Sequence, residues 1–249
     1  MPSVASSDKT VYFITGANRG IGFGLVKALA ARPNVFVFAT ARNPSKATAL
    51  NSLAEETGNI EVVKLESVNE QDAQDAAKVV EEKAGKLDVL IANAGISEGY
   101  GLASEQPADV YRRHYEVNVL GPLILFSALK PLLFKSANPK LLAVSTSGAS
   151  LTLNYPMPMA PYSASKASLN FVVEKFAQEH KKDNLTAFVL SPGWVQTDMG
   201  NSGAQAMGLK EAPVTLDDSV AGILKLADES TLESHSGRFW DYTGESLPW

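Results

Sequence analysis

Short apolar segments alternate along the chain with longer stretches in which hydrophobic positions recur every three or four residues. The apolar segments have the length and composition of buried strands; they are Val11–Thr15, Val35–Thr40, Ile60–Leu65, Leu87–Ala94, Lys140–Ser145, Leu185–Ser191 and a short one near Arg238–Tyr242. The stretches between them predict helices. One ends near Ala31 and one carries Tyr162; the others cover Ser45–Glu56, Gln71–Lys83, Ala108–Phe134 (bent near Gly121-Pro122) and Leu216–Ala227.

Strands that are apolar throughout and separated by helices indicate a parallel sheet covered on both faces. No shift in composition separates one part of the series from another. We therefore predict an α/β fold with a single doubly wound domain of the Rossmann type over residues 10–249, with a seven-stranded, mainly parallel sheet. Residues 1–9 are predicted to form a disordered tail.

The overall composition excludes several classes of protein. A net charge of −5 argues against a partner that is nucleic acid or an anionic membrane. No apolar run approaches the roughly 20 residues that span a bilayer, and the chain begins without the features of a secretion signal, so we expect a cytoplasmic protein. Cysteine is absent, and His114, His180 and His235 are scattered without ligand spacing. We predict surface positions for these histidines and no metal site.

The polar residues of interest follow the predicted strands. In a doubly wound sheet, ligands bind beyond the carboxyl ends of the strands. Five strand exits are rich in Gly, Ser, Thr and Asn, with the sequences TGANRGIG, ATARN, ANAGIS, STSGAS and SPGWVQTDM. The chemistry of the chain is therefore expected at this one edge of the sheet.

Gly16, Gly20 and Gly22 lie between the first predicted strand and the first predicted helix. Glycines allow a tight turn and a close approach of the backbone, and a helix N-terminus offers free N–H groups to a pyrophosphate. The spacing GxxxGxG differs from the GxGxxG of the usual dinucleotide fingerprint, and a simple turn is the alternative. The position of the loop favours a dinucleotide cofactor.

The end of the second strand indicates which dinucleotide binds. An NAD site usually has an acid there for the ribose 2′-hydroxyl. This chain instead has Arg42, with no acid before Glu55, and a second cation, Arg19, lies in the glycine loop. Guanidinium groups match the oxygens of a phosphate, so we predict NADP(H), against the alternative of two solvated surface arginines.

Tyr162 and Lys166 are four residues apart on a predicted helix and therefore share one face. A free phenol has a pKa near ~10, and an adjacent ammonium favours its ionised form, which would suit proton exchange at neutral pH. The alternative is that the tyrosine packs and the lysine extends to solvent by chance.

Together, and in this order, these motifs resemble the short-chain dehydrogenase/reductase superfamily in its compact form. The motifs are Thr15–Gly22, Asn93-Ala94-Gly95, Asn118, the Ser/Thr cluster at 145–147, Tyr162-x-x-x-Lys166 and Pro192-Gly193. The segments FWDYTGESLPW and PGWVQTDMG are similar to those of C-factor and sniffer-type carbonyl reductases. Within that branch the likeness is greatest to fungal ketoreductases of the norsolorinic acid reductase type.

The resemblance implies roles for individual residues. Tyr162 would exchange the proton, Lys166 would bind the nicotinamide ribose and lower the pKa of Tyr162, and Asn118 would support a water-linked proton path to the lysine. For Asn118, a helix-kink residue bonded to backbone near Pro122 is the alternative. The implied cofactor residues are Gly16, Asn18, Arg19, Gly20, Ile21, Gly22, Arg42, Glu66, Ser67, Asn93, Ala94, Gly95, Tyr162, Lys166, Pro192, Gly193, Val195 and Thr197. Family members often form dimers or tetramers through the helix after Ala108 and the Tyr162 helix.

The family pattern has two serines at the end of the fifth strand, and the hydroxyl of the second holds the substrate carbonyl. This chain departs from that pattern. Side-chain alternation places Ser145 first and Thr146 second, and the loop before Tyr162 carries about three extra residues. Ser147 is the rival if the strand exit bulges by one residue. Ser145 is the residue expected merely to cap the loop.

Apolar side chains in loops at the ligand edge predict the substrate class. They are Tyr100, Leu153, Tyr155, Met157, Trp194 and Met199. A mobile loop, Thr197–Pro213, is expected to close over the ligand. We therefore predict an NADPH-dependent ketoreductase acting on a bulky, flat or aromatic carbonyl compound such as a secondary-metabolite intermediate. The alternatives are an NADP-binding regulatory or signalling protein with little turnover and an NAD-dependent alcohol dehydrogenase.

Overall fold

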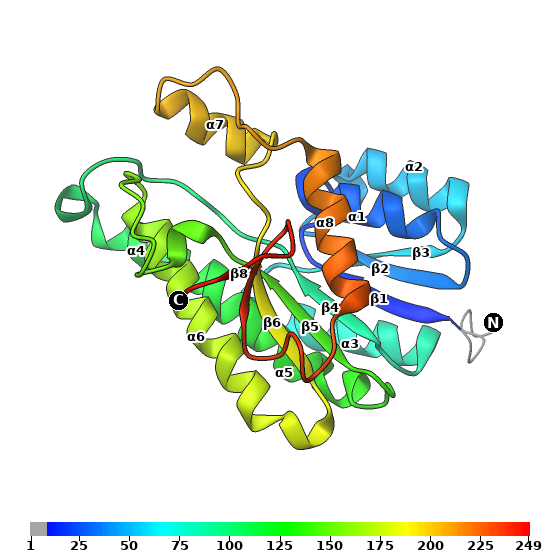
Figure 1. Cartoon of the computed structure of the whole chain (residues 1–249). Helices are drawn as coiled ribbons and strands as arrows, with labels where there is room; N and C mark the ends of the chain where they lie inside the picture. The colour runs from blue at the N-terminus through cyan, green and yellow to red at the C-terminus, as the bar shows by residue number, and fades with distance from the viewer. Residues whose placement is uncertain (1–8) are drawn as a thin grey trace.

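An eight-stranded sheet forms the centre of the molecule (Figure 1). The structure is a computed structural model that describes residues 9–249, so residues 1–8 of the predicted tail lie outside the described residues. The strand order is β3-β2-β1-β4-β5-β6-β7-β8. The strands are β1 (Thr10–Ile14), β2 (Val35–Ala41), β3 (Ile60–Lys64), β4 (Val89–Ala92), β5 (Lys140–Val144), β6 (Thr186–Ser191), β7 (Phe239–Asp241) and β8 (Ser246–Leu247).

The single α/β domain of the Rossmann type is confirmed, with one addition to the sheet. Strands β1 to β7 are parallel, and β8 pairs with β7 in the antiparallel direction. The prediction of seven strands is thus wrong by one edge strand. β8 has only two residues, too few to produce a period-two pattern, and it is held through the turn that follows β7.

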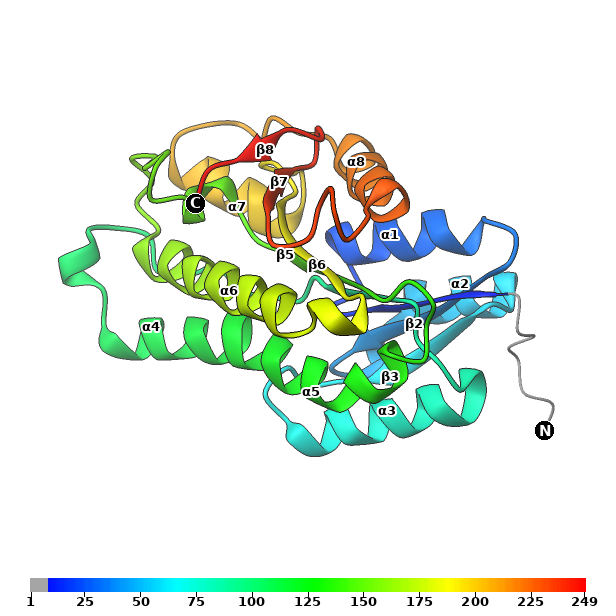
Figure 2. The same cartoon turned by 60° about the horizontal axis from the view of Figure 1, so that its bottom comes forward.

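Helices cover both faces of the sheet (Figure 2). One face carries α1 (Gly20–Ala30), α2 (Thr48–Thr57) and α8 (Leu216–Glu229); the other carries α3 (Glu70–Ala84), α5 (Gly121–Leu133) and α6 (Ala160–Glu179). Alternate strand residues point to the two layers, so that Phe13 and Phe38 pack under α3, α5 and α6, whereas Ile14 and Val37 pack under α1 and α8. Short 3₁₀ turns complete the connections: η1 (Pro44–Lys46), η2 (Ala103–Glu105), η4 (Ser147–Ala149) and η5 (Lys181–Asp183).

The long helix predicted after residue 107 is interrupted, but not by a bend at Gly121-Pro122. α4 (Ala108–Tyr115) passes through a π-helical segment, η3 (Glu116–Leu120), into α5. The combined helix, Ala108–Leu133, is long and apolar enough to cross a membrane, which the sequence analysis did not recognise. In this fold it is a core helix, because Leu125, Phe126 and Leu129 are buried against the sheet and the neighbouring helices.

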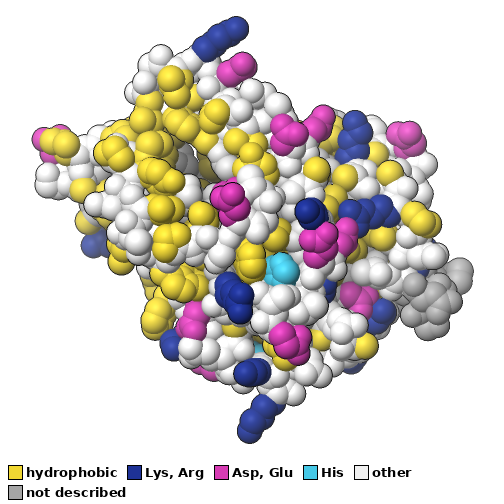
Figure 3. Space-filling model, viewed as in Figure 1, with side chains coloured by type: hydrophobic (Ala, Val, Ile, Leu, Met, Phe, Trp, Pro, Cys, Tyr) yellow, Lys and Arg dark blue, Asp and Glu magenta, His cyan; other side chains and the backbone are white. Residues whose placement is uncertain are grey.

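α7 (Asp198–Ala206) was predicted as loop but is a helix that stands over the carboxyl ends of the strands (Figure 1). Its three glycine and asparagine residues disfavour a helix, which explains the missed prediction. Thr197 compensates at the N-cap, where its hydroxyl accepts a hydrogen bond from the Gly200 amide at 3.1 Å. Hydrophobic side chains gather below α7 around a hollow on this side of the molecule (Figure 3).

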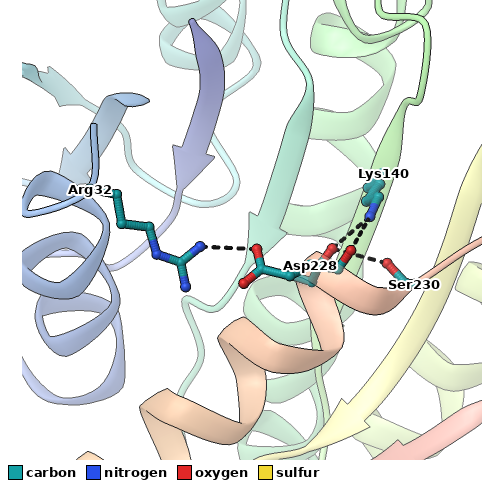
Figure 4. A network of polar contacts seen from close by, with 5 residues as sticks. Arg32, Lys140, Asp228 and Ser230 are labelled. Carbon is teal, nitrogen blue, oxygen red and sulfur yellow. Dashed lines mark hydrogen bonds and ion pairs between the residues drawn. The ribbon is translucent and has the colours of Figure 1, made fainter. Parts of the chain in front are cut away.

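The opposite, amino-terminal edge of the sheet is closed by polar contacts (Figure 4). The Lys140 ammonium, at the start of β5, donates to the carbonyl of Ala227 at 2.6 Å and lies 3.4 Å from that of Asp228, at the end of α8. Burial lowers the pKa of Lys140. The Asp228 carboxylate pairs with Arg32 at 2.9 Å, which joins α8 to the segment after α1. These charges serve the fold, and the functional residues lie at the other edge.

Candidate active site

The glycine loop lies where β1, β2 and β4 end. Gly16 and Gly20 have φ values of 63° and 54°, which disfavour residues with a side chain. A Cβ added to Gly22 would overlap the carbonyl oxygen of Gly16, so the turn requires glycine there too. The Asn93 side-chain amide donates to the Thr15 carbonyl at 2.8 Å, and the Ala17 amide donates to the Thr40 carbonyl at 2.8 Å. The loop is therefore fixed by its neighbours before any ligand binds.

The N-terminus of α1 suits an anion. Arg19 is the N-cap residue, its side chain forms no capping hydrogen bond, and the first turn carries no acid among these described residues. The first amides of the helix therefore point out of the loop with a partial positive charge. Because the glycines leave the backbone open there, the residues fit the phosphates of a dinucleotide.

The two arginines of the cofactor hypothesis are both exposed at this edge. Arg42 directly follows β2, whose Thr40 contacts the glycine loop. Arg19 lies 3.5 Å from the Asp198 carboxylate at the start of α7, and both side chains are largely in solvent. Such an exposed pair contributes little free energy, so the guanidinium remains available for a ligand.

The remaining predicted cofactor residues come from three strand exits. Glu66 and Ser67 form a turn whose Glu66 amide donates to Asp72 at 3.0 Å and whose Ser67 carbonyl approaches Gly121. The amides of Asn93 and Ala94 both donate to the Thr15 hydroxyl, which joins the NAG turn to β1.

After β6, Pro192 accepts a hydrogen bond from the Ser219 hydroxyl at 2.7 Å. Gly193 has φ 80°, and a Cβ there would lie 2.8 Å from the Tyr242 ring. Val195 is buried, and the methyl group of Thr197 faces Gly20. The segment between β6 and α7 therefore touches the glycine loop.

Tyr162 and Lys166 are neighbours on the first two turns of α6. The Lys166 ammonium lies 5.9 Å from the centre of the Tyr162 ring and donates a hydrogen bond to the Val144 carbonyl at 2.7 Å. Lys166 is only 3% exposed. The alternative in which this lysine extends into solvent is therefore wrong.

Burial dominates the ionisation of both groups. It raises the pKa of the Tyr162 phenol, with a further increase from the nearby Tyr100 phenol. Burial lowers the pKa of Lys166 to about 8. Desolvation is the largest influence on the pKa of Tyr162, and the lowering of that pKa by the Lys166 ammonium stays a prediction. The phenol is held in its protonated, proton-donating form.

Asn118 lies in η3 and is completely buried. Its side-chain oxygen accepts from the Ile96 amide at 2.9 Å, and its side-chain nitrogen donates to the Ile96 carbonyl at 3.0 Å and to the Ser165 hydroxyl at 2.9 Å. It does bond to backbone, but to the loop after β4 and not near Pro122. The π-helical segment turns Asn118 toward that loop.

Gly95 lies between Asn118 and Lys166. A Cβ added at Gly95 would be 3.0 Å from the Asn118 oxygen and 3.4 Å from the Lys166 nitrogen. The glycine therefore keeps open the space between these two predicted catalytic groups.

The three hydroxyls after β5 differ from the expected arrangement. Ser145 is buried and donates to Asn170 on α6 at 2.5 Å, so the prediction that Ser145 caps the loop is wrong. Thr146 is the capping residue of η4, with its hydroxyl oxygen accepting from the Gly148 amide at 3.2 Å. Ser147 is the first residue of the same turn. Both Thr146 and Ser147 are partly exposed toward the site edge.

The predicted substrate residues come from three segments: the loop after β4, the stretch from the end of β6 into α7, and the loop before α6. Tyr100 follows β4, and its phenol oxygen would lie 3.3 Å from a Cβ at Gly203 of α7. The Trp194 indole donates to the Gly200 carbonyl at 2.9 Å, which ties it to the same helix. Met199, on α7, is 37% exposed. α7, Tyr100 and Trp194 thus form one side of the rim.

Leu153, Tyr155 and Met157 belong to the loop before α6. This loop meets the Tyr100 segment where the Gly101 amide donates to the Pro158 carbonyl at 2.9 Å. Its other end is held by Thr152, whose amide and hydroxyl both donate to the Trp249 carbonyl. Tyr155 is 50% exposed. Sequence reasoning missed Thr152, which no motif marks.

Comparisons with known proteins agree with this arrangement. A family model described as short chain dehydrogenase matches residues 10–207. The chain belongs to the short-chain dehydrogenase family. A norsolorinic acid ketoreductase of Aspergillus parasiticus is 41% identical to this short-chain dehydrogenase over 251 residues, with 97% of this chain and 92% of the relative covered.

Two solved structures share the fold of this short-chain dehydrogenase with a TM-score of 0.88 each. One is an NADPH-bound carbonyl reductase from chicken fatty liver, 30% identical, with 97% of this chain and 99% of the other covered. The other is the carbonyl reductase Sniffer of D. melanogaster, 28% identical, with the same coverage. The family and the neighbours identify an oxidoreductase that acts on C=O or CH–OH groups, and the resemblance drawn from the sequence motifs is confirmed.

The buried Lys166 predicts a distinctive dependence of stability on pH. Its pKa falls from 10.5 in the unfolded chain to about 8 in the fold, so between these values the unfolded chain binds more protons and stability rises with pH. Replacing Lys166 by Met removes this term. We expect the stability of Lys166→Met relative to the wild type to fall by up to ~3 kcal/mol as the pH rises from 7 to 10.5.

Urea unfolding of the two proteins at a series of pH values measures this difference. Lys175→Met, on the exposed face of the same helix, serves as the control and should track the wild type. A difference between Lys166→Met and the wild type that does not change with pH would show that the ammonium is not buried.

Proposed function

We propose that this short-chain dehydrogenase is an NADP(H)-dependent ketoreductase that reduces a bulky or aromatic ketone to an alcohol. The observation that carries the proposal is the pairing of the half-buried Tyr162 with the buried Lys166, near a glycine loop that suits phosphates and an apolar rim. A protein that only binds a dinucleotide has no need of such a pair, because burying an ammonium and a phenol costs free energy.

Tyr162 is the proposed proton donor to the carbonyl oxygen. Burial keeps its phenol protonated, which suits the reductive direction, in which an alkoxide must receive a proton. The bound cofactor supplies the hydride. Lys166, with its pKa lowered to about 8, holds a proton close to neutral pH and is the proposed partner of both the phenol and the nicotinamide ribose. Asn118 holds the loop next to Lys166, in keeping with a water-linked path between them.

The preference for NADP(H) follows from the charge at the end of β2. Arg42 stands where an acid would bind the 2′-hydroxyl of NAD, and Arg19 adds a second guanidinium from the glycine loop. The solved carbonyl reductase from chicken fatty liver has NADPH bound, which supports the same cofactor here.

The substrate class follows from the rim. Tyr100, Trp194 and Met199 provide aromatic and polarisable apolar surface, and α7 provides a cover over it. The relative from Aspergillus parasiticus is named as a norsolorinic acid ketoreductase, which supports a ketone as the substrate. NADPH oxidation with a panel of aromatic ketones, aliphatic ketones and small keto acids is the direct assay. No turnover with any ketone would favour a regulatory dinucleotide-binding protein.

Tyr162→Phe tests the proton donor. The ring and its packing remain, but the proton is lost, so we expect turnover to fall by roughly 10²–10⁴ while the Kd for NADPH stays within about twofold. Steady-state kinetics with a ketone from the panel and fluorescence titration with NADPH measure the two effects. Tyr115→Phe removes an exposed phenol on α4, outside the rim and the catalytic residues, and is the matched control. Wild-type turnover in Tyr162→Phe would refute the assignment.

The cofactor preference is tested at Arg42, because Ala41 is buried and a charge there would disturb β2. Arg42→Asp combined with Arg19→Ala removes both guanidiniums and adds repulsion of the 2′-phosphate. We expect the Kd for NADPH to rise by about 10–100-fold and that for NADH to change little. Arg112→Asp, on α4 and away from the loop, makes the same charge change as Arg42→Asp and is the control for that substitution. Equal affinities of the wild type for NADPH and NADH would contradict the proposal.

Thr146 is the proposed residue that holds the substrate carbonyl. Its hydroxyl oxygen accepts from Gly148, which orients the group and leaves its proton free to be donated to a ligand. Thr146→Ala is expected to lower turnover by roughly 10²–10³, and Thr146→Ser to restore most of it. Steady-state kinetics of these variants and of Ser147→Ala measure the effect. A near wild-type Thr146→Ala together with an inactive Ser147→Ala would assign the role to Ser147.

A further inference from the structure

His114 is completely buried, whereas its isolated position in the sequence predicted a surface residue. It lies in the last turn of α4, which packs against α6. Its Nδ1 atom is 2.7 Å from the Val110 carbonyl, and its Nε2 atom accepts a hydrogen bond from the Glu98 amide at 3.2 Å. A carbonyl only accepts and an amide only donates, so a single neutral tautomer, protonated at Nδ1, satisfies both contacts.

The His114 ring also meets the proposed proton donor. The ring centres of His114 and Tyr162 are 6.4 Å apart with an angle of 69° between the planes, which is an edge-to-face arrangement. Both nitrogens of His114 are engaged with backbone groups. The ring therefore contributes to the site through packing, with no nitrogen left to carry a proton to the phenol.

The Glu98 amide belongs to the loop that carries Tyr100. Asn118 binds this loop at Ile96, and His114 binds it two residues later. An exposed ion pair between Arg113 and Glu98, at 2.8 Å, is a third contact. Tyr100 follows at once, touching α7 at Gly203 and raising the pKa of Tyr162. One side chain is thus in contact with the Tyr162 ring and with the base of the substrate rim.

We propose that His114 is a positioning residue that fixes the Tyr162 ring and the Tyr100 loop relative to one another. It acts on the reaction only through these two neighbours. The proposal rests on the proposed role of Tyr162 as proton donor. It assigns two separable tasks to His114: the ring faces Tyr162 and the Nε2 lone pair holds Glu98.

Two substitutions separate the tasks. His114→Phe keeps an aromatic ring but loses the acceptor for the Glu98 amide, so the rim loosens and we expect KM for the ketone to rise about tenfold with a smaller change in kcat. His114→Gln keeps a hydrogen-bond acceptor but loses the ring, so we expect kcat to fall up to about tenfold with a smaller change in KM. Arg112→Ala, an exposed neighbour on α4, should match the wild type.

Two measurements besides turnover make the test specific. The Kd for NADPH should stay within about twofold in both variants, because His114 touches no part of the glycine loop. Hydrogen exchange at the Glu98 amide should be faster in His114→Phe than in the wild type. In His114→Gln it should be slower than in His114→Phe, because an acceptor for this amide remains. These results would support the proposal even if Tyr162→Phe retained activity, in which case the role of Tyr162 and not the link to the loop would be wrong.

The proposal is overturned by either of two outcomes. Wild-type kcat and KM in both variants would show that His114 has no influence on the site. A parallel loss of kcat, NADPH affinity and amide protection across the domain, in His114→Phe and His114→Gln alike, would show that His114 serves only the stability of the fold.

Discussion

Burying the ammonium of Lys166 is the constraint on which the active site depends. An ammonium removed from water needs compensation, and here the Val144 carbonyl accepts its hydrogen bond at the end of β5. That bond fixes α6 against the sheet edge, and it places Tyr162, half-buried on the same helix, beside the ammonium. The lowered pKa of Lys166 and the raised pKa of Tyr162 are two results of the same desolvation.

The polar contacts around this pair hold the surrounding loops in place. The glycine loop is bound to Thr40 and Asn93, the segment after β4 to Asn118 and His114, and the loop before α6 to Gly101 and Trp249. Each loop is fixed by a partner from another part of the chain: a neighbouring strand or strand exit, a helix, or the C-terminal residue. The site is consequently preorganised by the packing of neighbouring exits, which is the arrangement expected when several loops must present groups to one ligand.

The sequence predicted the features that depend on local pattern. The strands, the glycine loop and the Tyr162–Lys166 spacing all follow from periodicity or from residue type at a fixed separation. Prediction from the sequence failed where contacts between residues far apart in the chain determine the structure. The two-residue β8 exists only by pairing with β7, and His114 and Ser145 are buried by partners far along the chain. α7 is a different case, because its glycines are offset by a local cap, Thr197, which the prediction did not take into account.

The π-helical segment between α4 and α5 sets a limit on changes in chain length. A π turn holds one residue more than an α turn, and each residue of an α-helix turns the chain by about 100°. Five residues of the π segment therefore turn the chain through about the same angle as four residues of an α-helix, so deleting a single residue within 116–120 would leave α4 and α5 with nearly the same relative rotation. The same deletion inside α5, before Leu125, would instead rotate the residues on its two sides by about 100°, so that His114 could no longer face α6 while Leu125 and Phe126 face the sheet. Tolerance to a lost residue is thus confined to the turn that carries Asn118.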